Sequence, residues 1–204
     1  MSADVEMTPQ EESGGTKQAW SHSDSPDVIT SIALFLSNKV RAHDLKFQTT
    51  KNPKTNFTSS FPPPITIDQY LFHLIRSVRT APGVVVYMLI YIEKIIGVLE
   101  RKYQKQTRSN VPFLMTSYNA HRLVLTAFLL AHKYCEDFKY DTSRMAKIGG
   151  VHPKELLKLE REFLKFIKFE LYVSEETFTN YHNAVLLYSQ SLEQNSSSAR
   201  NRWS

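Results

Sequence analysis

Residues 119–134 read N-A-H-R-L-V-L-T-A-F-L-L-A-H-K-Y and carry the strongest structural signal in this chain. Between Leu123 and Ala131 nearly every side chain is apolar, so a helix formed here is apolar on every side. Such a helix is stable only where other helices surround it. The stretch therefore predicts the central helix of an all-α bundle.

Start and stop signals on both sides of this stretch predict further helices. Ser25-Pro26-Asp27 is typical of a helix start, and Thr66 with Gln69 fits a capping box. Gly149-Gly150 ends a short helix that begins at Asp141. No window shows the alternation of a strand, so we expect about seven helices, five of them consecutive from Thr66 to Phe169. The remaining predicted helices begin at Ser25, Val84, Pro153 and Ser174.

Length and charge predict one domain with a polar segment at each end. A chain of 204 residues holds one domain of ordinary size. Residues 1–25 are polar and carry a net charge of −4, which predicts a disordered acidic tail, and the rest of the chain carries +9. We expect the folded domain at 26–193 and a flexible C-terminal tail at 194–204. The basic body favours acidic partners, including nucleic acid.

The single cysteine, Cys135, excludes an internal disulfide and favours a cytoplasmic or nuclear location. No signal peptide is visible at the N-terminus. The apolar runs Val84–Ile92 and Leu123–Ala131 each span nine residues, which is too short to cross a bilayer. We therefore predict no membrane partner.

The motifs of common enzymes are missing from the sequence. It contains no GxGxxG or GxxxxGK[ST] loop for nucleotides and no HExxH metal motif. His132 lies three residues before Cys135, but a catalytic pair needs a cleft and a third group that orients the base. A cysteine at a buried helix end is usually a small apolar side chain. We predict a protein that is not an enzyme and needs no cofactor or metal.

Glu160 is the residue that indicates a binding function. In a helix over Pro153–Lys168 it falls within the apolar arc, where an unpaired carboxylate is costly. Lys133 ends the central helix and is a candidate partner. Two interpretations stay open: an internal ion pair with Arg122 or another helix, or a charged pair at the rim of a docking surface.

A longer pattern surrounds these two residues. Residues 114–137 read L-M-T-S-Y-N-A-H-R-L-V-L-T-A-F-L-L-A-H-K-Y-C-E-D, followed by A-K-I-G-G at 146–150 and by Leu159-Glu160 and Phe163-Leu164. From about Thr66 to Tyr181 the chain resembles a cyclin, most closely the P/U-type or phosphate-pathway cyclins. The resemblance implies a single cyclin box, a five-helix bundle around a central apolar helix, with flanking N- and C-terminal helices.

The resemblance also implies a function. Cyclins of this kind bind and activate a cyclin-dependent serine/threonine kinase as a heterodimer, in cell-cycle or nutrient- and phosphate-linked control. Lys133 and Glu160 match the pair that contacts the kinase near its mobile C helix. The positions that pack against that helix match Tyr134, Leu164, Phe169 and Leu171. A nucleic-acid-binding protein and a scaffold that does not activate the kinase are the alternatives, although nucleic-acid binders of this fold usually carry two repeats.

Two positions depart from the family pattern. His73 stands where the family has an arginine in the first box helix, and Glu93 stands for an aspartate in the second. In cyclins that arginine and aspartate brace the box, so we expect a His73–Glu93 contact in their place, with a pH-dependent strength. The M-R-A-I-L motif that some cyclins use to recruit substrates is missing from the sequence.

Overall fold

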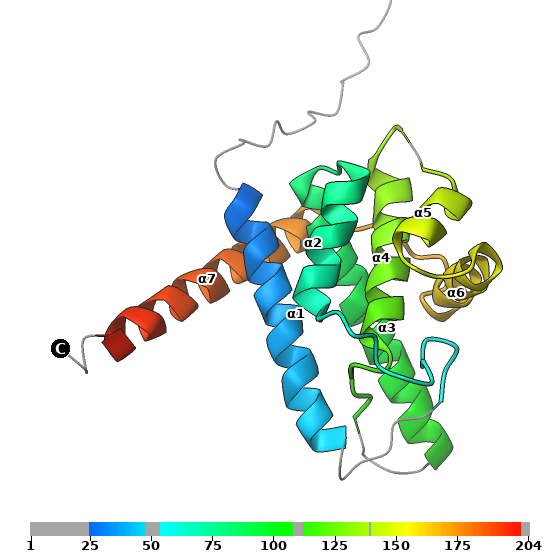
Figure 1. Cartoon of the computed structure of the whole chain (residues 1–204), viewed down its shortest axis with the longest axis horizontal. Coiled ribbons are helices and arrows are strands. Elements are labelled where there is room, and N and C mark those ends of the chain that lie inside the picture. Colours follow the sequence, from blue (N-terminus) through cyan, green and yellow to red (C-terminus); the bar gives the residue numbers. More distant parts are fainter. Residues whose placement is uncertain (1–24, 48–53, 108–111, 139, 201–204) are drawn as a thin grey trace, which may run out of the picture.

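The computed structural model describes residues 25–47, 54–107, 112–138 and 140–200, with side chains from 28 to 191 within these ranges and at 194. The predicted tail at 1–25 lies almost wholly outside this part. The described residues form helices and no strand, which confirms the all-α prediction (Figure 1). The helices are α1 (Ser25–Phe47), α2 (Ile67–Val78), α3 (Pro82–Thr107), α4 (Ala120–Cys135), α5 (Thr142–Ile148), α6 (Pro153–Phe166) and α7 (Glu175–Arg200).

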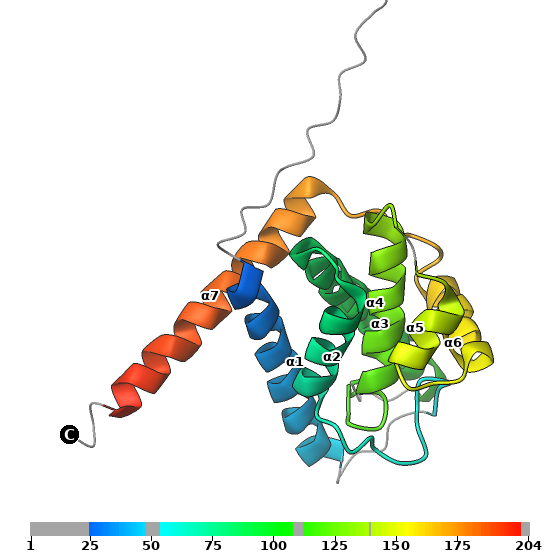
Figure 2. The same cartoon turned by 45° about the horizontal axis from the view of Figure 1, so that its top comes forward.

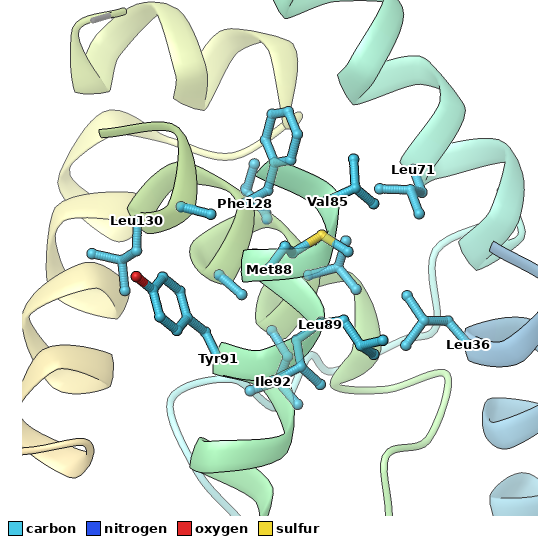
Figure 3. Close-up of a cluster of buried hydrophobic side chains, with 14 of the residues drawn as sticks. Leu36, Leu71, Val85, Met88, Leu89, Tyr91, Ile92, Phe128 and Leu130 are labelled. Atoms are coloured by element: carbon cyan, nitrogen blue, oxygen red, sulfur yellow. The ribbon is translucent and has the colours of Figure 1, made fainter. Parts of the chain in front are cut away.

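Helix α4 is central, as its sequence predicts. Every residue from Leu123 to His132 is buried, and the helix packs against α2, α3 and α6. Figure 3 shows part of this core, where Phe128 and Leu130 of α4 lie among Met88, Tyr91 and other side chains of α3. An all-round apolar helix finds its partners here on several neighbours at once, which is why the bundle closes around it.

The Gly149-Gly150 pair ends α5, as predicted, and also lets α5 approach α4. Gly150 has a φ of 69°, a conformation that suits glycine. A Cβ on Gly149 would lie 2.5 Å from the side chain of Leu125 in α4. The pair is therefore required both for the turn and for close packing against the central helix.

Two helices extend further than the sequence predicts. Helix α3 continues to Thr107 through the polar residues 101–107, and α7 continues to Arg200, beyond the predicted domain boundary at 193. Neither extension has the apolar periodicity that identifies a helix. Once a helix is nucleated, each added residue costs little, so polar segments can continue it without a signal in the sequence.

The two helices that flank the box, α1 and α7, pack on each other. Helices α1 and α7 cross, and the C-terminal part of α7 extends away from the body of the molecule (Figures 1 and 2). Helix α3 is long and apolar enough to cross a membrane by length and composition alone, but 67% of its most apolar window is buried inside the protein. That degree of burial is typical of a core helix.

Candidate functional site

Lys133 and Glu160 form an ion pair between the end of α4 and the middle of α6. Lys133 Nζ lies 2.6 Å from Glu160 Oε1 and 3.2 Å from the hydroxyl of Thr142, the first residue of α5. One ammonium group thus joins three helices. The Glu160 side chain is 11% exposed and that of Lys133 is 31% exposed, so the carboxylate is recessed rather than fully outward-facing.

The structure selects one of the two ion-pair arrangements that the sequence left open for Glu160. Arg122 does not pair with Glu160, because its guanidinium lies 2.6 Å from Glu155 one turn earlier on α6. Glu160 instead has Lys133 as its partner within the chain. The question of function then depends on what surrounds this pair.

Apolar side chains flank the recessed pair along the chain, since Tyr134 follows Lys133 and Leu164 lies one turn after Glu160 on α6. Tyr134 and Phe169, both predicted for this site, are 45% and 64% exposed, and Leu164 and Leu171 are half-buried. Soluble proteins rarely leave several large apolar groups together in water unless the patch binds a partner. We refer to Lys133, Tyr134, Glu160, Leu164, Phe169 and Leu171 as the α4–α6 face.

Two further residues, missed by the sequence reasoning, extend this face. Leu157 on α6 is 47% exposed, and Tyr172 after α6 is 73% exposed. On a helix at about 100° per residue, Leu157 lies within about 20° of Leu164. Leu157 lies outside the buried apolar arc of α6, next to charged residues, and this position was the signal that could have identified it.

The backbone after α6 places Phe169 at the surface. The amide of Phe169 donates to the carbonyl of Leu164 at 2.8 Å, and that of Lys168 donates to Lys165 at 3.2 Å, which is a Schellman turn. Lys168 and Phe169 have φ values of 55° and 61°. Two successive left-handed residues that are not glycine cost stability, and such strain is often found at binding sites.

Side chains of α3 hold this strained turn in place. The Tyr91 hydroxyl donates to the carbonyl of Leu171 at 2.7 Å, and Lys94 donates to the carbonyls of Glu170 and Tyr172 at 3.4 and 3.2 Å. Burial raises the pKa of Tyr91, which keeps its hydroxyl protonated and able to donate. The exposed aromatic side chains therefore project from a backbone that is already ordered.

Aromatic packing also fixes Tyr134. Its ring lies 5.8 Å from that of Tyr87 on α3, and Tyr87 in turn contacts the rings of Tyr91 and Phe178 at 6.2 and 5.1 Å. A tyrosine held on a ring cluster has little side-chain entropy left to lose on binding. The α4–α6 face is thus largely pre-organised in the free chain.

The expected bracing contact between His73 and Glu93 is corrected by the structure, which gives each residue another partner. The His73 ring nitrogen Nε2 lies 3.0 Å from the carbonyl of Ile148 at the end of α5. The Tyr181 hydroxyl donates to Glu93 at 2.7 Å. Burial, and to a lesser extent this hydrogen bond to Glu93, raises the pKa of Tyr181 to about 12. The pairing fails because α2 turns His73 towards α5, while α3 turns Glu93 towards α7.

The groups that resemble catalytic ones are poorly suited to catalysis. Cys135 is exposed as a residue, yet burial of its thiol raises the pKa to about 12, so the thiolate is scarce at neutral pH. The His132 ring packs between Phe128 and Tyr140, and burial lowers its pKa. Within the described part of the chain, no three or more His, Cys, Asp or Glu side chains are grouped to hold a metal.

Comparison with known proteins gives the family. The family model described as Cyclin matches residues 6–171. This chain belongs to the cyclin family. The match starts ahead of the predicted domain boundary at residue 26 and covers all the helices from α1 to α6.

The relatives of this cyclin are of the predicted type. It is 31% identical to Cyclin-U4-3 of Arabidopsis thaliana over 76% of this chain and 65% of that protein. It is 28% identical to the PHO85 cyclin-like protein psl1 of Schizosaccharomyces pombe over 82% of this chain and 70% of that protein. It is 34% identical to PHO85 cyclin-7 of Saccharomyces cerevisiae over 62% of this chain and 44% of that protein. These matches confirm the resemblance to P/U-type cyclins, although the chain spans only 47 to 65% of the first three plant relatives.

Proposed function

We propose that this cyclin binds a cyclin-dependent kinase through the α4–α6 face and activates it as a heterodimer. The observation that carries the proposal is the recessed Lys133–Glu160 pair with exposed Tyr134 and Phe169 beside it. Its membership of the cyclin family and its similarity to PHO85 cyclins support a role as a regulatory subunit.

The mechanism is a shift in the conformational equilibrium of the kinase. A kinase is active only when its C helix places a glutamate against the catalytic lysine. A rigid surface that binds only this inward position favours the active state. A change from about 1:99 to 99:1 requires a difference in binding free energy of roughly 5.5 kcal/mol.

The ion pair cannot supply that difference, because a partly exposed pair contributes about 1 kcal/mol or less. The pair is also already formed in the free chain, so its formation gives nothing new on binding. The apolar groups of the face must therefore contribute most of the binding free energy, with the charges fixing the register of the two helices.

The experiment that tests the proposal is affinity purification of the tagged chain, followed by kinetics with the kinase that co-purifies. Tyr134→Ala and Phe169→Ala remove exposed rings without opening the core, and each should weaken binding about 10- to 100-fold. Leu45→Ala and Leu187→Ala, at 71% and 65% exposed sites on α1 and α7, are matched controls that should bind normally. Equal affinity for all four variants would contradict the proposal.

Activation needs its own measurement. The kinase alone and the purified pair are compared on one peptide substrate, and we expect activity only in the pair. A pair that forms without gaining activity would make this cyclin a scaffold. The same complexes, isolated under phosphate-replete and phosphate-starved growth, would show whether the role is in nutrient signalling or in the cell cycle.

A further inference from the structure

One side of α6 carries a row of basic side chains with no acidic residue in it. The row consists of Lys154, Lys158, Arg161 and Lys165 on the helix and Lys168 in the turn after it, all of them exposed. At about 100° per residue the four helical positions fall within an arc of about 60°, and at 1.5 Å per residue they span about 17 Å. We call this row the α6 basic stripe.

The acidic residues of α6 are used elsewhere. Glu155 pairs with Arg122, Glu160 pairs with Lys133, and Glu162 accepts a hydrogen bond from Asn56. Within the described part of the chain, no ion pair involves a side chain of the stripe. The stripe is therefore a positive surface without internal compensation.

The stripe is not what helix stability alone would select. Successive members are three or four residues apart, a spacing at which like charges repel and destabilise the helix. Cations near the C-terminus, such as Lys165, complement the helix dipole, but Lys154 in the first turn opposes it. A surface chosen only for solubility would carry both signs of charge.

The position of the stripe indicates what it binds. On the helix circumference Glu160, Leu164 and Leu157 lie side by side, and Arg161 of the stripe follows next, with no acidic residue between them. A partner that covers Leu164 and Leu157 therefore comes next to the stripe. Charge complementarity then requires acidic groups on the neighbouring part of that partner.

We propose that the α6 basic stripe docks an acidic surface on the kinase itself, beside the segment that the α4–α6 face binds. This inference rests on the proposed function and adds a requirement on the partner: of several kinases in a cell, the chain selects one with acidic groups next to its C helix. The stripe acts mainly on the association rate, because exposed charges steer encounter more than they hold the complex.

The experiment compares two charge-reversal variants of the full chain. The stripe variant carries Lys154→Glu, Lys158→Glu, Arg161→Glu and Lys165→Glu. The control variant carries Arg41→Glu, Lys54→Glu, Arg101→Glu and Lys105→Glu, at exposed positions on α1, the 54–66 segment and α3. Both variants change the net charge by the same amount, so the control separates the effect of position from that of total charge.

Association of each variant with the co-purified, immobilised kinase is measured between 50 and 500 mM salt. We expect the stripe variant to associate roughly tenfold more slowly than the wild type at low salt, with the difference lost at high salt. The control variant should change by less than about twofold. Thermal melting of both variants verifies that they are folded.

Three outcomes would overturn the inference. In the first, the stripe variant associates with the kinase at the wild-type rate at every salt concentration. In the second, the stripe variant and the control variant are slowed equally. In the third, the stripe variant associates normally with the kinase but loses binding to a DNA duplex of 20 base pairs that the wild type binds. Tyr134→Ala in the same assay separates the two proposals. If it lowers affinity at all salt concentrations while the stripe variant is normal, the proposed function stands and only the role of the stripe is lost.

The double variant Lys158→Glu with Lys165→Glu separates binding from helix stability. It places opposite charges four residues apart, at 154 with 158 and at 161 with 165. It also places a carboxylate at position 158, four residues before Glu162, and removes a cation from the last turn, so these effects on the helix largely cancel. We expect an unchanged melting temperature together with slower association. A stripe that served only to stabilise the fold would instead give a lower melting temperature and normal association.

Discussion

Two ion pairs join the same two helices and differ in what surrounds them. Arg122–Glu155 and Lys133–Glu160 each connect α4 to α6 at 2.6 Å. Glu155 has a side-chain exposure of 36%, whereas that of Glu160 is 11%. Exposed aromatic side chains lie near both pairs but are supported differently. Tyr134 packs on Tyr87, and Phe169 is held by the turn after α6, whereas Phe61, which lines a pocket with Arg122, belongs to the 54–66 segment.

The comparison shows that a short ion pair does not by itself identify a binding site. Both pairs have the same length and join the same elements, so their charges alone cannot separate them. The support of the neighbouring rings can, because exposed rings held on an ordered backbone lose little side-chain entropy when a partner covers them. Variants that alter one pair or its surroundings at a time can measure this difference.

Removing one carboxylate should separate the two pairs most clearly. Glu160→Ala leaves the Lys133 ammonium without its recessed partner and should lower the free energy of unfolding by about 2 kcal/mol. Glu155→Ala removes a carboxylate that is 36% exposed and should cost less, about 1 kcal/mol, even though the Arg122 side chain that it leaves is only 24% exposed. Urea denaturation of both variants and the wild type measures the difference, and equal losses would show that the two pairs are equivalent in the free chain.

An apolar replacement of the recessed pair separates stability from binding. Lys133→Met with Glu160→Leu leaves no unpaired charge and should restore most of the stability lost in Glu160→Ala. Its affinity for the kinase should stay reduced, because the register-fixing charges are gone. Recovery of full affinity in this double variant would assign the pair a purely structural role.

Acid should destabilise both ends of α4, since each pair has a buried histidine beside it. Burial lowers the pKa of His121 and of His132 from the ordinary value of 6.5. The unfolded chain therefore binds more protons near pH 6 than the folded chain does, and the free energy of unfolding falls as the pH drops below about 6.5. Each pKa unit of difference corresponds to about 1.4 kcal/mol.

Urea denaturation at pH 7.5 and 5.5 measures this loss. The variant His132→Leu removes one titrating group next to Lys133, so it should lose less stability between these pH values than the wild type. A pH dependence identical to that of the wild type would mean that His132 has similar pKa values in the folded and unfolded chain.

The smallest effect concerns the strained turn that presents Phe169. Phe169→Gly relieves a left-handed residue with a φ of 61° and removes a ring that is 64% exposed. We expect the free energy of unfolding to rise by roughly 1 kcal/mol while kinase affinity falls. A higher free energy of unfolding together with a lower kinase affinity would indicate that the strained turn serves the binding face. A lower free energy of unfolding would contradict the idea that the turn is strained.

Much of the fold could be predicted because its signals are local. The apolar stretch of α4 and the Gly149-Gly150 stop each act through a few neighbouring residues, and both were confirmed. The ends of α3 and α7 were not predicted, since polar residues continue a helix without leaving a periodic pattern. The identity of the kinase-binding residues remains a prediction that the experiments above address.

The order of the amino acids is enough to predict an all-α protein with the cyclin pattern and a partner for Glu160. Which partner that is depends on the packed helices, because Lys133 and Arg122 lie on the same helix and sequence spacing does not tell how α4 crosses α6. The packing of the helices also decides that His73 and Glu93 face different neighbours, and that Phe169 projects from a strained turn. Side-chain pairing over long sequence distances depends on the packing of whole helices, and no local pattern records it.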